Sequence, residues 1–240
     1  MLKPLLKIRL STYFWIFLVT YGVLSFVLPS KKFESSALTL FSVNSLLYGF
    51  YIAPILAAQK ARIEELHKVV RAEANALFAI ALTSVSLPNK QHNDVMQLLT
   101  VYAQKVYKNK RVGAGEDEYE ALIHDSMNNT SDSAVIHNKI LDQLIANQIN
   151  RSNLALQMAN KVFSNEWWIM IVLFSISISF VMLLEIGDQI FLHVVKALLC
   201  TGLSMLLVIL IKLSTLTHKK AKLMWQPLKK LLDSNFYRID

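Results

Sequence analysis

The stretch ALTLFSVNSLLYGFYIAPILAA, residues 37–58, runs directly into QKARIEELHKVVRAEANALFAIAL, residues 59–82. The first half is apolar over the ~20 residues that a helix needs to cross a bilayer. The second half is charged, yet its apolar residues recur every three or four positions, as on one face of a helix. Pro54 disturbs the hydrogen bonding locally, and Leu87-Pro88 ends the pattern. We therefore expect one helix that leaves the membrane and continues for several turns into water.

Three more apolar windows flank this helix in a chain of 240 residues that is 54% hydrophobic. They are Ser11–Leu28, Trp167–Leu184 and Ile190–Leu213. The first is longer than the 7–15 apolar residues of a cleaved signal peptide, so we expect it to be retained. No alternating strand pattern is present. The sequence therefore predicts an all-α membrane protein with four transmembrane helices.

The region between the second and third windows is polar and helix-forming. We expect helices at residues 94–112, 116–127 and 134–165, the last with Ile145 and Ile149 on its apolar face and running unbroken into the third window. A cytoplasmic helical bundle would then consist of extensions of transmembrane helices 2 and 3, with shorter helices packed against them. The predicted organisation is an N-terminal tail with helices 1 and 2 (1–58), a cytoplasmic helical domain (59–166), helices 3 and 4 (167–213) and a basic cytoplasmic C-terminal tail (214–240).

The net charge of +8 is concentrated beside the apolar windows. Residues 59–165 are nearly neutral, with twelve Lys and Arg against eleven Asp and Glu. Lysines next to a membrane attract anionic cytoplasmic lipid by about 1 kcal/mol each and favour the cytoplasmic side. Lys31 and Lys32 in the first short connection oppose this orientation, whereas Glu185 to Gln189 carries two acids and no base. We expect both termini and the middle domain in the cytoplasm, anionic lipid at the basic tails, and no nucleic-acid partner.

The second window carries two stripes of unusual composition. At 100° per residue, one stripe is polar and aromatic and the other consists of small residues on the roughly opposite side. In one interpretation both stripes pack helices, because small residues allow close approach. In the other, the first stripe lines an aqueous path and the second packs within the subunit. The first stripe is Asn44, Tyr48, Tyr51 and Ile55, and the second is Ser42, Ser45, Gly49 and Ala53.

Two ionisable residues, His193 and Lys196, lie three positions apart on one face of the fourth window. Ionisable groups inside a membrane are candidates for function. Lys196 lies close enough to the helix end to reach the interface. It could be neutralised there by Glu185 or Asp188, or it could attract anions.

Glu64 and His67 have the Glu-x-x-His spacing of one half of a di-iron site. The second half is missing, since Glu120 and His124 are four positions apart, so a surface histidine is the alternative. The sequence contains no phosphate-binding loop, nucleophile elbow or zinc spacing. We expect no metal, no cofactor and no enzymatic activity.

Several of these features occur together in a known pattern. A polar membrane helix enters a segment with Arg62, Val70 and Glu73-Ala74-Asn75-Ala76-Leu77, which ends at Leu87-Pro88; Tyr102, Arg151 and Trp167-Trp168 then follow. Over about residues 38–213 the chain resembles the bestrophin-like family of bacterial membrane proteins, a grouping of largely unknown function.

The resemblance implies a four-helix subunit distantly similar to bestrophins, which are pentameric anion channels with a pore-lining second helix. It implies a bacterial inner-membrane location, a homo-oligomer and a pore face formed by the Asn44 stripe. The chain has neither the aromatic-rich pore neck nor the acidic calcium clasp of true bestrophins, so calcium gating is not implied. Two functions remain. One is an ion channel, which the resemblance implies conducts anions. The other is a membrane-anchored scaffold that binds a protein partner through its cytoplasmic domain, where Glu116-Asp117-Glu118 is exposed.

Overall fold

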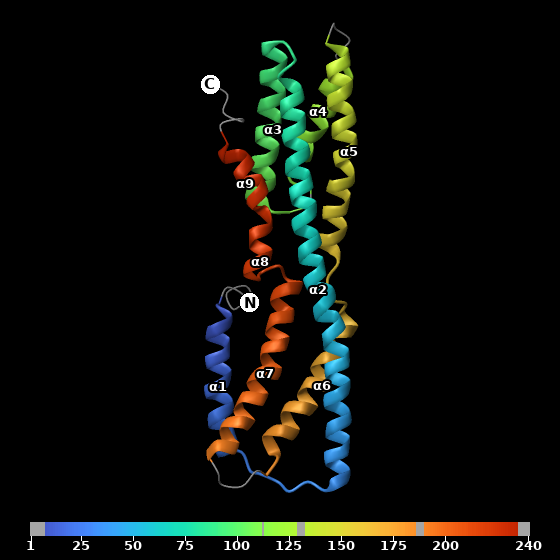
Figure 1. The fold of residues 1–240 in the computed structure, drawn as a ribbon. Helices are drawn as coiled ribbons and strands as arrows, with labels where there is room; N and C mark the ends of the chain where they lie inside the picture. Colours follow the sequence, from blue (N-terminus) through green and yellow to red (C-terminus); the bar gives the residue numbers. More distant parts are fainter. Residues whose placement is uncertain (1–7, 112, 129–132, 186–189, 235–240) are drawn as a thin grey trace. The chain divides into compact units, whose positions relative to one another are not determined.

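The computed structural model describes residues 8–111, 113–128, 133–185 and 190–234, and over these ranges it contains helices and no strand. Four helices, α1, α2, α6 and α7, are long and apolar enough to cross a membrane, which confirms the all-α prediction with four apolar helices. The elements in chain order (Figure 1) are α1 Leu10–Val27, α2 Ser35–Ser84, α3 Asn89–Asn109, α4 Glu116–Asn128, α5 Ala134–Ala159, α6 Ser164–Leu183, α7 Ile190–Ser214, α8 Lys219–Lys222, the 3-10 turn η2 Leu223–Trp225 and α9 Gln226–Asp233.

The chain divides into two compact units. The apolar unit comprises the described parts of residues 1–61 and 161–218, and the polar unit those of 62–160 and 219–240. Helix α2 contributes its first half to the apolar unit and its second half to the polar unit, and it stays helical through Pro54. The expected long helix from the second window is therefore present.

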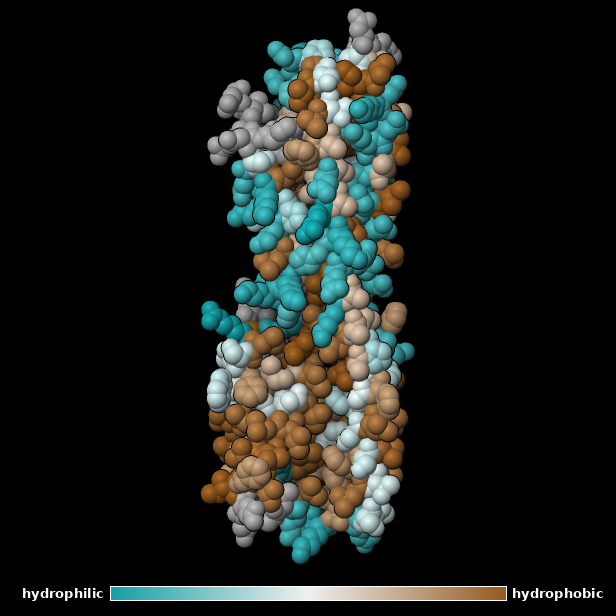
Figure 2. All heavy atoms as spheres, in the orientation of Figure 1, coloured by the Kyte–Doolittle hydropathy of each residue, from teal (hydrophilic) through white to brown (hydrophobic). Residues whose placement is uncertain are grey.

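The apolar unit is built from α1, α6, α7 and the first half of α2. Its core centres on Tyr48, Ile52, Met170 and Leu210, packed where α2 meets α6 and α7. Many of its large apolar side chains remain exposed in the single chain, and Figure 2 shows them covering much of this unit on the side drawn. An apolar outer surface of this extent is what lipid contact or a neighbouring subunit requires.

The polar unit packs α3, α4, α5 and α9 around the second half of α2. Residues of α2 at helical spacing are fully buried in it, including Leu66, Val70, Leu77 and Ile80. Each reaches the core because positions three or four apart share one face of a helix. Figure 2 shows that hydrophilic residues cover much of this unit on the side drawn.

The boundary between the last soluble helix and the third window differs from the prediction. Instead of one unbroken helix, α5 ends at Ala159 and α6 begins at Ser164. The backbone N–H of Phe163 donates to the Glu166 carboxylate at 2.9 Å, which satisfies a free donor at the start of α6. The predicted extension of transmembrane helix 3 is therefore a separate helix.

The predicted apolar face of α5 is also wrong in part. Ile140 and Leu144 are buried, but Ile145 and Ile149 are 57% and 65% exposed. They lie about 100° or more around the helix from the buried line, so the apolar residues of α5 form two faces rather than one.

Candidate functional site

Asn44 and Tyr48 of α2 are buried inside a single chain, at 9% and 2% exposure. The Asn44 amide donates to the Leu173 carbonyl at 3.1 Å and to the Ser177 hydroxyl at 2.8 Å, both on α6. The Tyr48 ring packs against Phe174, with a centroid distance of 6.3 Å. Tyr51 and Ile55 are half-buried and pack on the same apolar cluster. In the single chain this stripe joins α2 to α6 and α7, and its role as a pore lining stays a prediction.

The small-residue stripe of α2 lies on the opposite side. Ser42, Gly49 and Ala53 are exposed in the single chain, and Ser45 is half-buried. A Cβ added at Gly49 would meet no atom within 4 Å. In the single chain the Asn44 stripe is covered and most of the small-residue stripe is exposed, because the amide of Asn44 finds its partners within the subunit. Which of the two stripes faces an aqueous path stays a prediction.

Lys196 of α7 is 4% exposed, and its Nζ donates to the Leu184 carbonyl at 3.2 Å, just past the end of α6. Its ammonium thus satisfies a carbonyl that α6 leaves free. Glu185 instead approaches Lys32 at 3.9 Å, and Asp188 lies outside the described residues. His193 stacks on Phe26 with ring centroids 4.4 Å apart.

In the polar unit, a buried carboxyl meets a buried phenol. Glu73 of α2 is 1% exposed and occupies the same helix face as Val70 and Leu77. The Tyr102 hydroxyl of α3 donates a short hydrogen bond to Glu73 Oε1. The other oxygen, Oε2, has no partner among the described residues.

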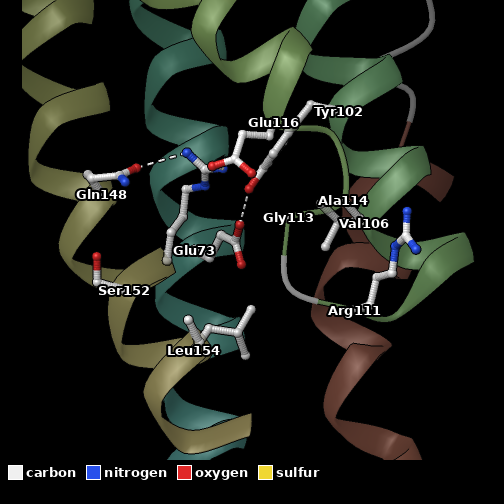
Figure 3. Close-up of a pocket in the computed structure, with 12 residues that line it drawn as sticks. Glu73, Tyr102, Val106, Arg111, Gly113, Ala114, Glu116, Gln148, Ser152 and Leu154 are labelled. Atoms are coloured by element: carbon white, nitrogen blue, oxygen red, sulfur yellow. Dashed lines mark hydrogen bonds and ion pairs between the residues drawn. The ribbon is translucent and has the colours of Figure 1, made fainter. Parts of the chain in front are cut away.

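Arg151 of α5 completes this cluster, in which Figure 3 shows the Tyr102 hydroxyl directed at the Glu73 carboxylate. Its guanidinium lies 3.9 Å from the ring centre of Tyr119 on α4 and 5.7 Å from that of Tyr102. It donates to Gln148 Oε1 at 2.8 Å and approaches the Glu116 carboxylate at 3.9 Å. Four helices, α2 to α5, thus each supply a side chain to one network, which we call the Glu73 cluster (Glu73, Tyr102, Tyr119 and Arg151).

The electrostatics of the Glu73 cluster follow from its burial. Loss of water raises the pKa of Glu73, while the Tyr102 hydrogen bond and the positive charge of Arg151 lower it by less. Burial likewise raises the pKa of Tyr102 and Tyr119, so both phenols stay protonated at neutral pH. The cluster can therefore exchange a proton at one place, the Glu73 carboxyl.

A cavity of about 140 Å³ opens beside this carboxyl. At ~30 Å³ per water molecule, it has room for about four or five waters. Its wall includes Arg111, Gly113, Ala114 and Ser152. Gly115 lies close against Tyr102, since a Cβ there would lie 2.7 Å from the Tyr102 ring.

Arg62 fixes the neighbouring end of α5. Its guanidinium is buried and donates to the carbonyls of Gln157 at 2.6 Å and Met158 at 3.1 Å. These carbonyls belong to the last turn of α5, where the helix leaves acceptors free.

The sequence analysis named Arg62 and three residues of the Glu73 cluster but assigned them no role. Arg62, Glu73, Tyr102 and Arg151 carried the resemblance, and only the fold brings the last three together. One local signal could have identified Glu73: it is an acid on the apolar face of an amphipathic helix, where a charge needs a partner.

Glu64 and His67 do not meet a third ligand. His67 Nε2 lies 2.8 Å from the Lys220 carbonyl, and no cluster of three or more His, Cys, Asp or Glu suited to a metal occurs in the described part of the chain.

Comparison with known proteins gives one match. The family model described as Bestrophin-like domain matches residues 12–218, which include nearly all of α1, the apolar helices α2, α6 and α7, and the Glu73 cluster. No curated protein and no solved structure matches the chain. Since the match covers well over half of the sequence, the chain belongs to the bestrophin-like family of membrane proteins.

Proposed function

We propose that this protein is a homo-oligomeric ion channel of the membrane, anion-conducting, with α2 lining the pore. The observation that carries the proposal is the exposed stripe of Ser42, Gly49 and Ala53 on a helix that is otherwise apolar enough to span a membrane. Contact with lipid tails stabilises serine hydroxyl groups and the backbone at glycine only weakly. Such small residues instead allow close helix packing or face water. Membership of the bestrophin-like family supports the same function.

The proposed orientation places the polar unit in the cytoplasm. The basic residues that support it are Arg9 before α1 and the lysines of α8, all of them exposed. We propose that these residues contact anionic lipid at the inner surface of a bacterial inner membrane. On this proposal the polar unit forms a vestibule that ions cross, and the protein needs no cofactor and catalyses no reaction.

Flux measurements test the proposal. Purified protein in liposomes should pass chloride or nitrate, measured with an anion-quenched dye inside the vesicle. Gly49→Leu should reduce this flux several-fold by filling the exposed stripe. Gly202→Leu, the same change at an exposed position of α7 where an added Cβ likewise meets no atom within 4 Å, is the matched control and should leave the flux unchanged. Well-folded oligomers that pass no ion would contradict the proposal.

A second function, a membrane-anchored scaffold without transport, is favoured by a different observation. The first turn of α4 consists of Glu116, Asp117 and Glu118, of which the first two are exposed. Such a surface suits a basic protein partner. Co-purification of a stoichiometric partner that is lost on Asp117→Lys, from a protein without flux, would support this function over the channel.

A further inference from the structure

The polar unit exposes apolar side chains on two of its helices, away from any apolar window. On α2 these are Phe78, Leu82 and Val85, and on α5 they are Ile145, Ile149 and Leu156, all between 43% and 65% exposed. Large apolar side chains grouped on the surface of a polar domain mark an interaction site.

The two groups point away from each other. Thr83 of α2 and Gln143 of α5 face one another, since their side chains exchange hydrogen bonds at 3.1 and 3.3 Å. At 100° per residue, Leu82 and Phe78 lie about 100° and 140° around α2 from Thr83. Ile145 and Ile149 lie about 160° and 120° around α5 from Gln143. With the direction of rotation included, both groups lie on the face of this helix pair that turns away from the buried residues, and they point about 80° apart. They therefore do not cover each other within one chain.

The two groups also lie at the same height along the bundle. The Thr83–Gln143 contact and the bond from Arg62 to the Gln157 carbonyl align α2 and α5 antiparallel. Counting 1.5 Å per residue from the first contact, Leu82 and Ile145 differ in height by about 1.5 Å. Phe78 and Ile149 differ by about the same amount. A rotation about an axis parallel to these helices preserves height, so it can bring one group against the other in a second copy.

Charge adds a second complementarity. A groove of about 710 Å³ between α2 and α9 is lined by Arg71 and Lys230 and by no acid. A hollow of about 520 Å³ on α4 is lined by Asp117 and Glu120, among others, and by no Lys or Arg. Arg71 lines the groove together with Phe78 of the α2 group, and α4, which carries the acids, packs against α5. The cations therefore lie on the α2–α9 side and the anions on the α4–α5 side.

We infer that the α4–α5 side of one copy docks on the α2–α9 side of the next, with Ile145 against Leu82 and Ile149 against Phe78. The contact joins two different surfaces, and repeating it by rotation closes a ring. The inference rests on the proposed homo-oligomer and goes further by naming the surfaces that build it.

Cysteine crosslinking in membranes tests the pairing. In a Cys200→Ala background, Leu82→Cys with Ile145→Cys, and separately Phe78→Cys with Ile149→Cys, place one thiol on each side of every chain. A disulfide needs Cα atoms about 4.4–6.8 Å apart. Oxidation should therefore give a ladder of covalent multimers that ends at the ring size. The matched control is Leu82→Cys with Leu156→Cys, which are both exposed but about 18 Å apart in height, and it should give none.

Charge exchange tests the same contact by a different route. Arg71→Glu with Lys230→Glu, or Asp117→Lys with Glu120→Lys, should each weaken assembly at least tenfold, as measured by mass photometry in detergent. The variant with all four changes should recover the assembly of the original protein, because both charges are exchanged.

The outcomes separate this inference from the proposed function. A protein that is monomeric in the membrane overturns both. An oligomer that yields no ladder with either cysteine pair, or the same ladder with the height-mismatched pair, overturns the inference and leaves the channel proposal standing. A ladder in a protein without ion flux supports the interface and contradicts the channel.

Discussion

The phenol of Tyr102 on α3 donates a hydrogen bond to one oxygen of Glu73 on α2, while the other oxygen is buried and has no partner among the described residues. One residue thus joins two helices and still keeps an acceptor available. The arrangement makes the stability of the polar unit dependent on the protonation of a single group.

Tyr102→Phe should destabilise the polar unit by about 1–3 kcal/mol, because it leaves both oxygens of a buried carboxyl without a partner. Glu73→Gln should cost less, since its amide oxygen can still accept the bond from Tyr102. Urea unfolding followed by circular dichroism measures both. In the double variant the losses should be non-additive, and strict additivity would mean that the two residues do not interact.

The stability of the polar unit should fall as the pH rises. Burial raises the pKa of Glu73 above its ordinary value of 4.5, so the folded protein holds this proton more tightly than the unfolded chain. The resulting stabilisation is complete below the unfolded pKa and is lost as the pH rises through the folded pKa. Between pH 5 and pH 8, the melting temperature of the original protein should therefore decrease relative to that of Glu73→Gln. Parallel pH profiles for the two proteins would contradict the assignment.

Gly115→Ala should destabilise the protein by about 2 kcal/mol or more. Gly115 has φ +77°, and a Cβ there would lie 2.7 Å from the Tyr102 ring, so backbone strain and a clash add. Gly113→Ala is the matched control. It has a similar φ of +76°, but its Cβ would meet only the end of the flexible Glu116 side chain at 3.2 Å, so about 1 kcal/mol is expected. Thermal denaturation of the two variants under identical conditions gives the comparison.

Asn44→Leu should weaken the apolar unit by about 1–2 kcal/mol, because α2 loses two hydrogen bonds to α6 in a segment apolar enough to span a membrane. Ser42→Leu, at an exposed position two residues earlier, should change monomer stability by less than about 0.5 kcal/mol. Thermal unfolding in detergent provides the measurement. Equal losses in both variants would show that the Asn44 bonds do not hold α2 to α6.

Much of the fold could be predicted from local pattern. Hydropathy located the four apolar helices, and the period of apolar residues in residues 59–82 predicted that α2 continues beyond its apolar half. Both properties depend on neighbours within a few turns, so one sequence contains them. The break between α5 and α6 was missed, because Asn160 to Phe163 include no proline or glycine, and the capping by Glu166 becomes visible only in the folded backbone.

The sequence by itself determined that this chain is helical, that four of its helices suit a membrane and that it resembles the bestrophin-like family. Only the tertiary structure decided which stripe of α2 is covered, because Asn44 finds its partners 129 and 133 residues away. It also decided that Glu73 meets Tyr102, and that Ile145 and Ile149 face outward. Helical periodicity says which residues share a face, but the partner of each face is set by packing between distant segments.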